Sequence, residues 1–144
     1  MPKKKNHSSG FTLIELIVVI VILGILASLI APKVLKRADQ ALLVKAQQDM
    51  RSIESALQLY RLDNYEYPSS AQGLKVLVTK PADVKAATWQ DGGYLKKVPK
   101  DPWGNLYLYV YPGHHGDFDL TSLGADGKIG GTKNNTDINL WELD

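Results

Sequence analysis

Two carboxylates and several amide or hydroxyl oxygens gather in one glycine-rich stretch near the C-terminal end. Asp126 and Asp137 bracket it, and residues 134–136 read Asn-Asn-Thr. Calcium takes roughly six to eight hard oxygens in flexible geometry, often including backbone carbonyls. Glycines at 124, 127, 130 and 131 let the backbone turn inward and offer such carbonyls. The spacing is not that of an EF-hand, so composition alone leaves a solvated turn as the alternative to a calcium site.

A second ionisable group stands in apolar surroundings, because Glu15 is the one charged residue between positions 11 and 31. A helix over residues 11–31 would be about 31 Å long, roughly the thickness of the hydrocarbon core of a bilayer. The stretch has no polar face, which predicts a membrane span. A cluster of basic residues precedes it, Lys3, Lys4 and Lys5. Such clusters tend to stay in the cytoplasm, which puts residues 32–144 on the outer side.

An acidic residue within a membrane span usually has a partner or a function. Glu15 lies in the first helical turns, where the helix macrodipole favours a negative charge. An isolated helix cannot easily fold its own N-terminal amine onto this position, but a neighbouring subunit displaced along the helix axis can offer one. The position of Glu15 therefore predicts assembly.

The junction before the span carries a specific motif. Residues 10–15, Gly-Phe-Thr-Leu-Ile-Glu, resemble the processing site of the type IV pilin and pseudopilin superfamily. The resemblance implies that a prepilin peptidase removes residues 1–10 as a basic leader by cutting between Gly10 and Phe11. It also implies that Phe11 is then N-methylated, which keeps its positive charge available to Glu15 of a neighbour. An uncleaved signal anchor is the alternative.

Composition narrows the function classes. The chain has 17 Lys and Arg against 15 Asp and Glu, which argues against a nucleic-acid surface. It has no cysteine, so a small exported domain must be stabilised by oligomer contacts or a metal instead of disulfides. No His/Cys cluster suggests zinc. We find no nucleophile–base pair, paired acids or phosphate-binding loop in the sequence that would indicate an enzyme.

Beyond Pro32 the pattern becomes that of an amphipathic helix. Apolar residues recur at steps of three and four, at Leu35, Ala38, Leu42, Ala46, Met50, Ile53, Leu57 and Tyr60. With the span, they predict one helix of some fifty residues that ends at positions 62–64. Pro32 either kinks this helix or breaks it locally.

The remaining chain favours short elements. Ser69 and Gln72 have capping-box spacing, which predicts a short second helix, and residues 79–93 are predicted to form a loop. Residues 101–104, Asp-Pro-Trp-Gly, are typical of a turn. Alternating stretches 106–111 and 117–123 predict two strands, and His114 and His115 are expected to be exposed turn residues between them.

Four motifs in this region are similar to those of the major pseudopilins of bacterial type II secretion systems. They cover residues 67–74, 92–95, 101–104 and 122–127. The resemblance implies an α+β fold, in which a long N-terminal α-helix packs on a small antiparallel β-sheet beside a C-terminal calcium-binding loop. In that loop Leu123 and Lys128 would supply carbonyls and Asp126 and Asp137 carboxylates. One of Asn134, Asn135 and Thr136 would complete the shell, and Asn135 is the candidate among them.

The function implied is that of a structural subunit that polymerises into a pseudopilus and drives export of folded proteins. Its expected partners are further copies, minor pseudopilins, an inner-membrane assembly platform and prepilin peptidase, with no nucleic acid. It would cross the inner membrane once and place its C-terminal domain in the periplasm. The alternatives are a type IV pilus major pilin, which usually carries a disulfide, a DNA-uptake pseudopilin, and a membrane-anchored enzyme.

Overall fold

The computed structural model describes residues 10–82 and 88–143, so the basic cluster Lys3–Lys5 lies outside the described residues. The elements, in chain order, are α1 (Leu13–Asn64), η1 (Gly73–Leu77), β1 (Leu108–Val110), β2 (Asp119–Ser122), η3 (Lys133–Asn135), β3 (Ile138–Asn139) and η4 (Leu140–Glu142). The chain divides within α1 into two compact units, Met1–Ala38 and Asp39–Asp144.

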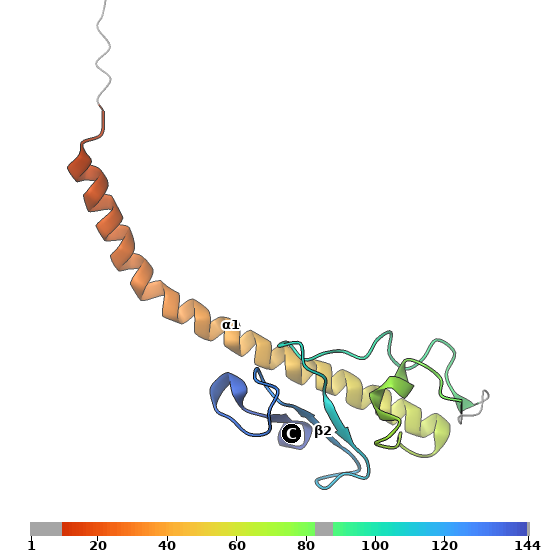
Figure 1. Ribbon diagram of the computed structural model, residues 1–144. Coiled ribbons are helices and arrows are strands. Elements are labelled where there is room, and N and C mark those ends of the chain that lie inside the picture. Colours follow the sequence, from red (N-terminus) through yellow and green to blue (C-terminus); the bar gives the residue numbers. More distant parts are fainter. Residues whose placement is uncertain (1–9, 83–87, 144) are drawn as a thin grey trace, which may run out of the picture. The chain divides into compact units, whose positions relative to one another are not determined.

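Helix α1 runs for 52 residues and is the longest element of the described chain (Figure 1). Its helical assignment continues through Pro32, so the prediction of one helix of some fifty residues is confirmed and there is no local break there. It ends at Asn64, as the sequence predicts. The backbone N–H of Tyr65 then donates to the carbonyl of Arg61 at 2.7 Å, and Tyr65 takes a φ of +65° that turns the chain out of the helix.

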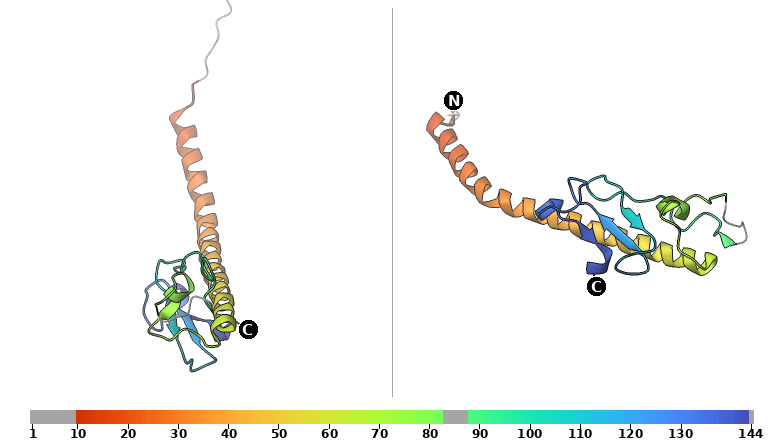
Figure 2. Two further views of the ribbon diagram at one scale, coloured as in Figure 1. Left: turned by 90° about the vertical axis from the view of Figure 1, so that its right-hand side faces the viewer. Right: turned by 60° about the horizontal axis from the view of Figure 1, so that its bottom comes forward.

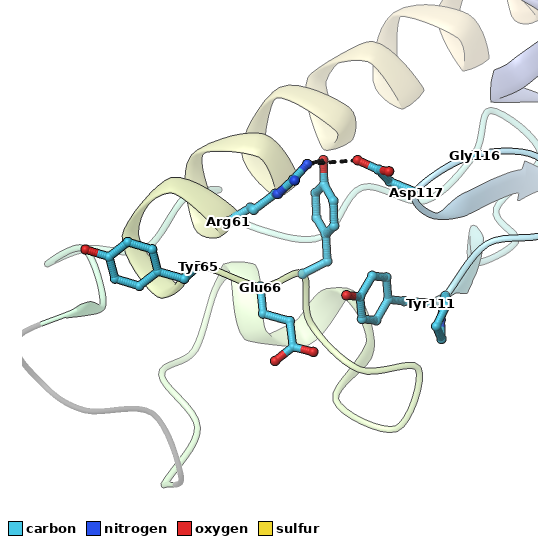
Figure 3. A pocket seen from close by; sticks show the side chains of 8 residues that line it. Arg61, Tyr65, Glu66, Tyr111, Gly116 and Asp117 are labelled. Carbon is cyan, nitrogen blue, oxygen red and sulfur yellow. Dashed lines mark hydrogen bonds and ion pairs between the residues drawn. The ribbon is translucent and has the colours of Figure 1, made fainter.

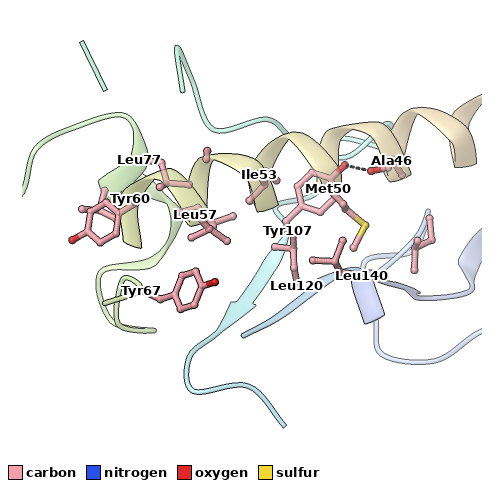
Figure 4. Packing of buried hydrophobic residues seen from close by; sticks show 14 residues of the cluster. Ala46, Met50, Ile53, Leu57, Tyr60, Tyr67, Leu77, Tyr107, Leu120 and Leu140 are labelled. Atoms are coloured by element: carbon pink, nitrogen blue, oxygen red, sulfur yellow. Dashed lines mark hydrogen bonds between the residues drawn. The ribbon is translucent and has the colours of Figure 1, made fainter. Parts of the chain in front are cut away.

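The second half of α1 supplies the core of the Asp39–Asp144 unit (Figure 4). The predicted stripe is buried from Ala46 onward, with five of its members at most 4% exposed: Ala46, Met50, Ile53, Leu57 and Tyr60. Leu77 of η1, Leu120 of β2 and Leu140 of η4 are buried against this cluster. The helical period of the stripe therefore decides which face of α1 the rest of the unit covers.

The predicted capping box forms after α1. Gln72 accepts a hydrogen bond from the N–H of Ser69 at 2.9 Å, and the Ser69 hydroxyl accepts one from the N–H of Gln72 at 3.2 Å. The helix that follows, η1, is a 3₁₀ helix of five residues and not an α-helix. Gly73 has a φ of +60°, and this left-handed residue prevents a regular α-helix from starting at the box.

The sheet has three antiparallel strands in the order β1-β2-β3 (Figure 2). β1 and β2 lie within the two predicted strands but are shorter than predicted. β3 has two residues, too few to produce a sequence pattern. The aromatic side of the alternating stretch is the more buried one, because Tyr107 is 6% exposed, whereas Leu106 is 66% exposed.

Candidate functional site

The predicted processing site lies in the short segment before α1. Gly10 and Phe11 are both exposed, and Phe11 is 85% exposed. A Cβ added to Gly10 would meet nothing within 4 Å. The fold therefore does not require a glycine at this position, which leaves recognition by another protein as a reason for it.

Glu15 lies in the first turn of α1, where Thr12 partners it. One carboxylate oxygen, Oε2, accepts hydrogen bonds from the Thr12 N–H at 2.9 Å and from the Thr12 hydroxyl at 2.8 Å. The Thr12 hydroxyl in turn lies 3.3 Å from the N–H of Glu15. This is a capping box, in which residues three apart satisfy each other's free backbone donors.

Thr12 is a residue that the sequence reasoning missed. The signal was present, since Thr-Leu-Ile-Glu before an apolar run is the capping-box signature. Because of this capping box, a single subunit already provides neutral hydrogen-bond donors to Glu15. A cationic partner for the Glu15 charge is a separate requirement, which the box does not meet.

The helix behind this cap is apolar over its first five turns. Leu13–Ile30 is long and apolar enough to cross a membrane, with a mean hydropathy of 3.1. None of this segment is buried within the chain. Its apolar side chains therefore face whatever surrounds the helix, which fits lipid or other subunits better than water.

The predicted calcium ligands share one loop between β2 and β3. The register pairs Ser122 with Ile138, so Leu123 and Asp137 follow directly where the two strands diverge. Within the loop, the N–H of Ala125 donates to the Asn134 carbonyl at 2.8 Å. The antiparallel ladder thus places the first and last predicted ligands at its end, and the remaining three, Asp126, Lys128 and Asn135, lie between them.

Asp137 has a buried oxygen without a partner. Its Oδ2 accepts a hydrogen bond from the N–H of Gly130 at 2.8 Å, but its Oδ1 is buried and has no hydrogen-bond donor within the described part of the chain. An unsatisfied buried carboxylate oxygen is costly and needs an explanation. Asp126 differs, because it is exposed and its Oδ1 accepts from the N–H of Lys128 at 3.1 Å.

The donor set suits calcium better than a softer metal. Among residues 10–82 and 88–143, no three His, Cys, Asp or Glu side chains come together as a metal-binding group. Zinc and similar metals need such a group, whereas calcium accepts carbonyl oxygens and few carboxylates. The loop also holds glycines with positive φ at 124, 127, 130 and 131, the backbone geometry that brings carbonyls inward.

Asp101 supports this loop from the preceding turn, and the sequence reasoning did not single it out. It is 4% exposed, and its Oδ1 accepts from the N–H of Asn105 at 2.7 Å while its Oδ2 accepts from the Ser122 hydroxyl at 2.8 Å. Asn105 then donates from its side chain to the Gly124 carbonyl at 2.8 Å. The predicted turn at 101–104 therefore positions both the end of β2 and the start of the loop.

His115 is more than an exposed turn residue. Its ring stacks on Trp141 with centroids 4.0 Å apart, and its Nδ1 lies 3.2 Å from Oδ2 of Asp119. Asp119 also accepts from the N–H groups of His114 and His115. Burial alone would raise the pKa of the Asp119 carboxyl, but these hydrogen bonds together lower it below its ordinary value of 3.8.

The lowered pKa of Asp119 leads to a prediction about acid stability. We expect Asp119→Asn to lower the free energy of unfolding at pH 7 by roughly 1–3 kcal/mol, the usual contribution of hydrogen bonds to a charged acceptor. A carboxyl with a lowered folded-state pKa stabilises the fold above its unfolded-state pKa, and this stabilisation is lost as the pH falls through the folded value. Urea unfolding of the full chain in detergent at pH 7 and below pH 4 measures both quantities.

The matched control is Asp117→Asn on the same hairpin. Asp117 pairs with Arg61 at 2.8 Å on the surface (Figure 3), and surface ion pairs contribute about 1 kcal/mol or less. A stability gap for Asp119→Asn that is the same at pH 7 and pH 3 would contradict the role given to its charge.

The first part of α1 is an exposed apolar helix preceded by a Gly-Phe junction, and its second part supplies the core of a small α+β unit. This combination defines a pilin-like protein. The sequence matches the family model "Type II secretion system (T2SS), protein G" over residues 33–141 and "Prokaryotic N-terminal methylation motif" over residues 5–31. The chain belongs to the type II secretion system protein G family.

Relatives agree with this assignment. The chain is 54% identical to the type II secretion system core protein G of Pseudomonas aeruginosa, over 96% of this chain and 99% of that one. It is 48% identical to the core protein G of Vibrio cholerae, over 98% and 97%. The crystal structure of the major pseudopilin from the type 2 secretion system of enterohaemorrhagic Escherichia coli superposes with a TM-score of 0.63 and 39% identity, over 76% of this chain and 94% of that one. The expected α+β pseudopilin fold is confirmed.

Proposed function

We propose that this chain is a structural subunit that polymerises into the pseudopilus of a type II secretion system. Polymerisation would drive the export of folded proteins from the periplasm across the outer membrane. The observation that carries this proposal is that one chain joins a methylation-motif helix to a protein G domain. Family membership favours this function over a type IV pilin or a DNA-uptake pseudopilin, and its role is assembly instead of catalysis.

Complementation tests the proposal. In a bacterium whose own major pseudopilin gene is deleted, expression of this chain together with its cognate secretion proteins should restore exoprotein in the medium and filaments in the sheared fraction. A chain that is stably made and processed but restores neither filaments nor secretion would overturn it.

The membrane topology follows from the same segments. Leu13–Ile30 would cross the inner membrane once, with the leader in the cytoplasm and the Asp39–Asp144 unit in the periplasm. Assembly would then extract the helix from lipid into the filament, where further copies cover its apolar surface. Prepilin peptidase, the assembly platform and minor pseudopilins would be the partners of these steps.

Processing gives a direct prediction. Replacing Gly10 by Val should block removal of residues 1–10 and methylation of Phe11, because the peptidase needs a small residue before the cut. The fold itself has room for a side chain there, so a loss of cleavage reports recognition and not misfolding. Intact mass of the chain purified from membranes measures both modifications.

Gly24→Val is the matched control, since an added Cβ at Gly24 also meets nothing within 4 Å. This variant should be cleaved and methylated like the wild type. Normal cleavage of Gly10→Val, or a native N-terminus elsewhere than Phe11, would contradict the assigned site.

We also propose that the loop between β2 and β3 binds calcium. The support is the buried Oδ1 of Asp137, which has no partner among the described residues, and a loop whose glycines turn carbonyls inward. Asp137 would be the main carboxylate ligand and Asp126 the second, with carbonyls of Leu123 and Lys128 and an oxygen of Asn135. Calcium would supply the positive charge that holds the two ends of this loop together in a chain that has no disulfide.

A further inference from the structure

Tyr65 stands in a backbone conformation that suits its residue type poorly. It directly follows α1, where its N–H closes the last turn on the Arg61 carbonyl and its φ is +65°. This left-handed position after a helix is commonly a glycine, sometimes an asparagine. For a bulky side chain it is an outlier, and such outliers motivate a search for a functional reason.

Packing within the chain does not supply that reason. The Tyr65 side chain is 89% exposed and makes no hydrogen bond or ring contact with the described residues. Figure 3 shows its ring turned away from the Arg61–Asp117 pair. Leu62, one turn earlier on α1, is 72% exposed. The end of α1 therefore presents an aromatic and an aliphatic side chain, here called the helix-end patch, Leu62 and Tyr65.

A second apolar pair lies elsewhere on the same unit. Among the described residues of Asp39–Asp144, the only other large apolar side chains more than 60% exposed are Leu106 and Ile129, here called the loop patch. Asn105 donates to the carbonyl of Gly124, which ties the segment before Leu106 to the loop that carries Ile129.

The two patches lie at opposite ends of the unit. The hydroxyl of Tyr107, next to Leu106, contacts the carbonyl of Ala46, which precedes the end of α1 at Asn64 by roughly 27 Å at 1.5 Å per residue. Figures 1 and 2 agree, since the blue segment 123–137 and the yellow-green end of α1 lie at opposite ends of this unit.

We infer that the helix-end patch of one subunit packs on the loop patch of a second copy of this chain. The inference rests on the proposed function, because an open filament needs two different patches on each subunit that meet head to tail. Charge supports the pairing: Glu66 adjoins Tyr65, Lys128 adjoins Ile129, and neither side chain has an ion-pair partner within the described residues. The strained Tyr65 then serves the assembled state and not the free subunit.

The first test separates assembly from folding. Tyr65→Asn places at this φ a residue that tolerates it, so the melting temperature of the full chain in detergent should stay equal or rise. Filament yield in the sheared fraction should fall by about tenfold or more, as when an aromatic anchor leaves an interface. The control is His114→Asn, which removes an exposed ring outside both patches and should assemble normally. Wild-type filament yield from Tyr65→Asn would overturn the inference.

The second test identifies the receiving surface. Glu66→Lys should lower filament yield, and adding Lys128→Glu should restore it. Because the chain has no cysteine, a double variant with Tyr65→Cys and Ile129→Cys should give a disulfide ladder on oxidation of filaments, and each single variant should not. If wild-type filaments form but the double variant gives no ladder, the pairing of patches is wrong while the proposed function stands. If the wild type forms no filaments, the proposed function fails.

Discussion

Calcium is expected to raise the melting temperature of the full chain in detergent by about 10–20 °C over its value in chelator. An ion that binds only the folded state stabilises it by about 2.7 kcal/mol at a hundredfold excess over its dissociation constant. For a domain of this size each kcal/mol shifts the melting temperature by roughly 4–8 °C. Without the ion, the buried Oδ1 of Asp137 has no donor within residues 10–82 and 88–143.

Two variants and a control test the predicted calcium ligands. Asp137→Asn should remove most of the calcium-dependent shift, because it removes the charge of the carboxylate whose Oδ1 is buried without a donor among the described residues. Asp126→Asn should remove less, because Asp126 is exposed and already accepts from the N–H of Lys128. Asp91→Asn, an exposed carboxylate outside the loop, should behave like the wild type. Magnesium should substitute poorly, because it requires a smaller octahedral shell.

A melting temperature that is the same in calcium and in chelator would contradict the calcium proposal. The loop would then be a solvated turn, and the buried Oδ1 of Asp137 would need another explanation. A shift that survives Asp137→Asn but disappears in Asp126→Asn would keep the ion and reverse the order of the two ligands.

The sequence could predict α1 because one signal, the spacing of apolar residues, extends over many turns. Met50 and Leu57 are fully buried as this spacing requires, and the helix ends at the polar pair Asp63 and Asn64, four residues before Pro68. The capping box at Ser69 was also predictable, since its two residues are local. What followed the box was not, because the φ of Gly73 depends on the turn that it has to make.

Contacts between segments that are distant in the chain could not be predicted from the sequence pattern. The carboxylate of Asp101 reaches Ser122, and the ring of His115 stacks on Trp141. Neither partner is recognisable from spacing, because each contact exists only after the hairpin and the C-terminal segment are in place. The same holds for β3, which exists through its pairing with β2. Long-range polar contacts of this kind therefore require the structure.

Replacing Glu15 by Gln is expected to abolish filament assembly while insertion, leader removal and the start of α1 stay intact. The capping box uses one carboxylate oxygen, and glutamine can supply an equivalent acceptor at this position. What glutamine cannot supply is the negative charge that would meet the N-methylated amine of Phe11 on a neighbouring subunit. Filament yield should fall by about a hundredfold or more, the scale expected when one partner of a desolvated ion pair is lost.

Thr12→Val separates the cap from the charge. It removes the hydroxyl that donates to Glu15 but keeps both the backbone N–H and the carboxylate, so its effect on filament yield should be much smaller. Yields are measured in sheared fractions, with intact mass to verify that each variant is cleaved and methylated. Equal and severe loss in both variants would contradict this separation, because Glu15→Gln keeps an acceptor for the capping box and Thr12→Val keeps the charge. Normal filaments from Glu15→Gln would show that the charge of Glu15 is not required, and the intersubunit ion pair would have to be abandoned.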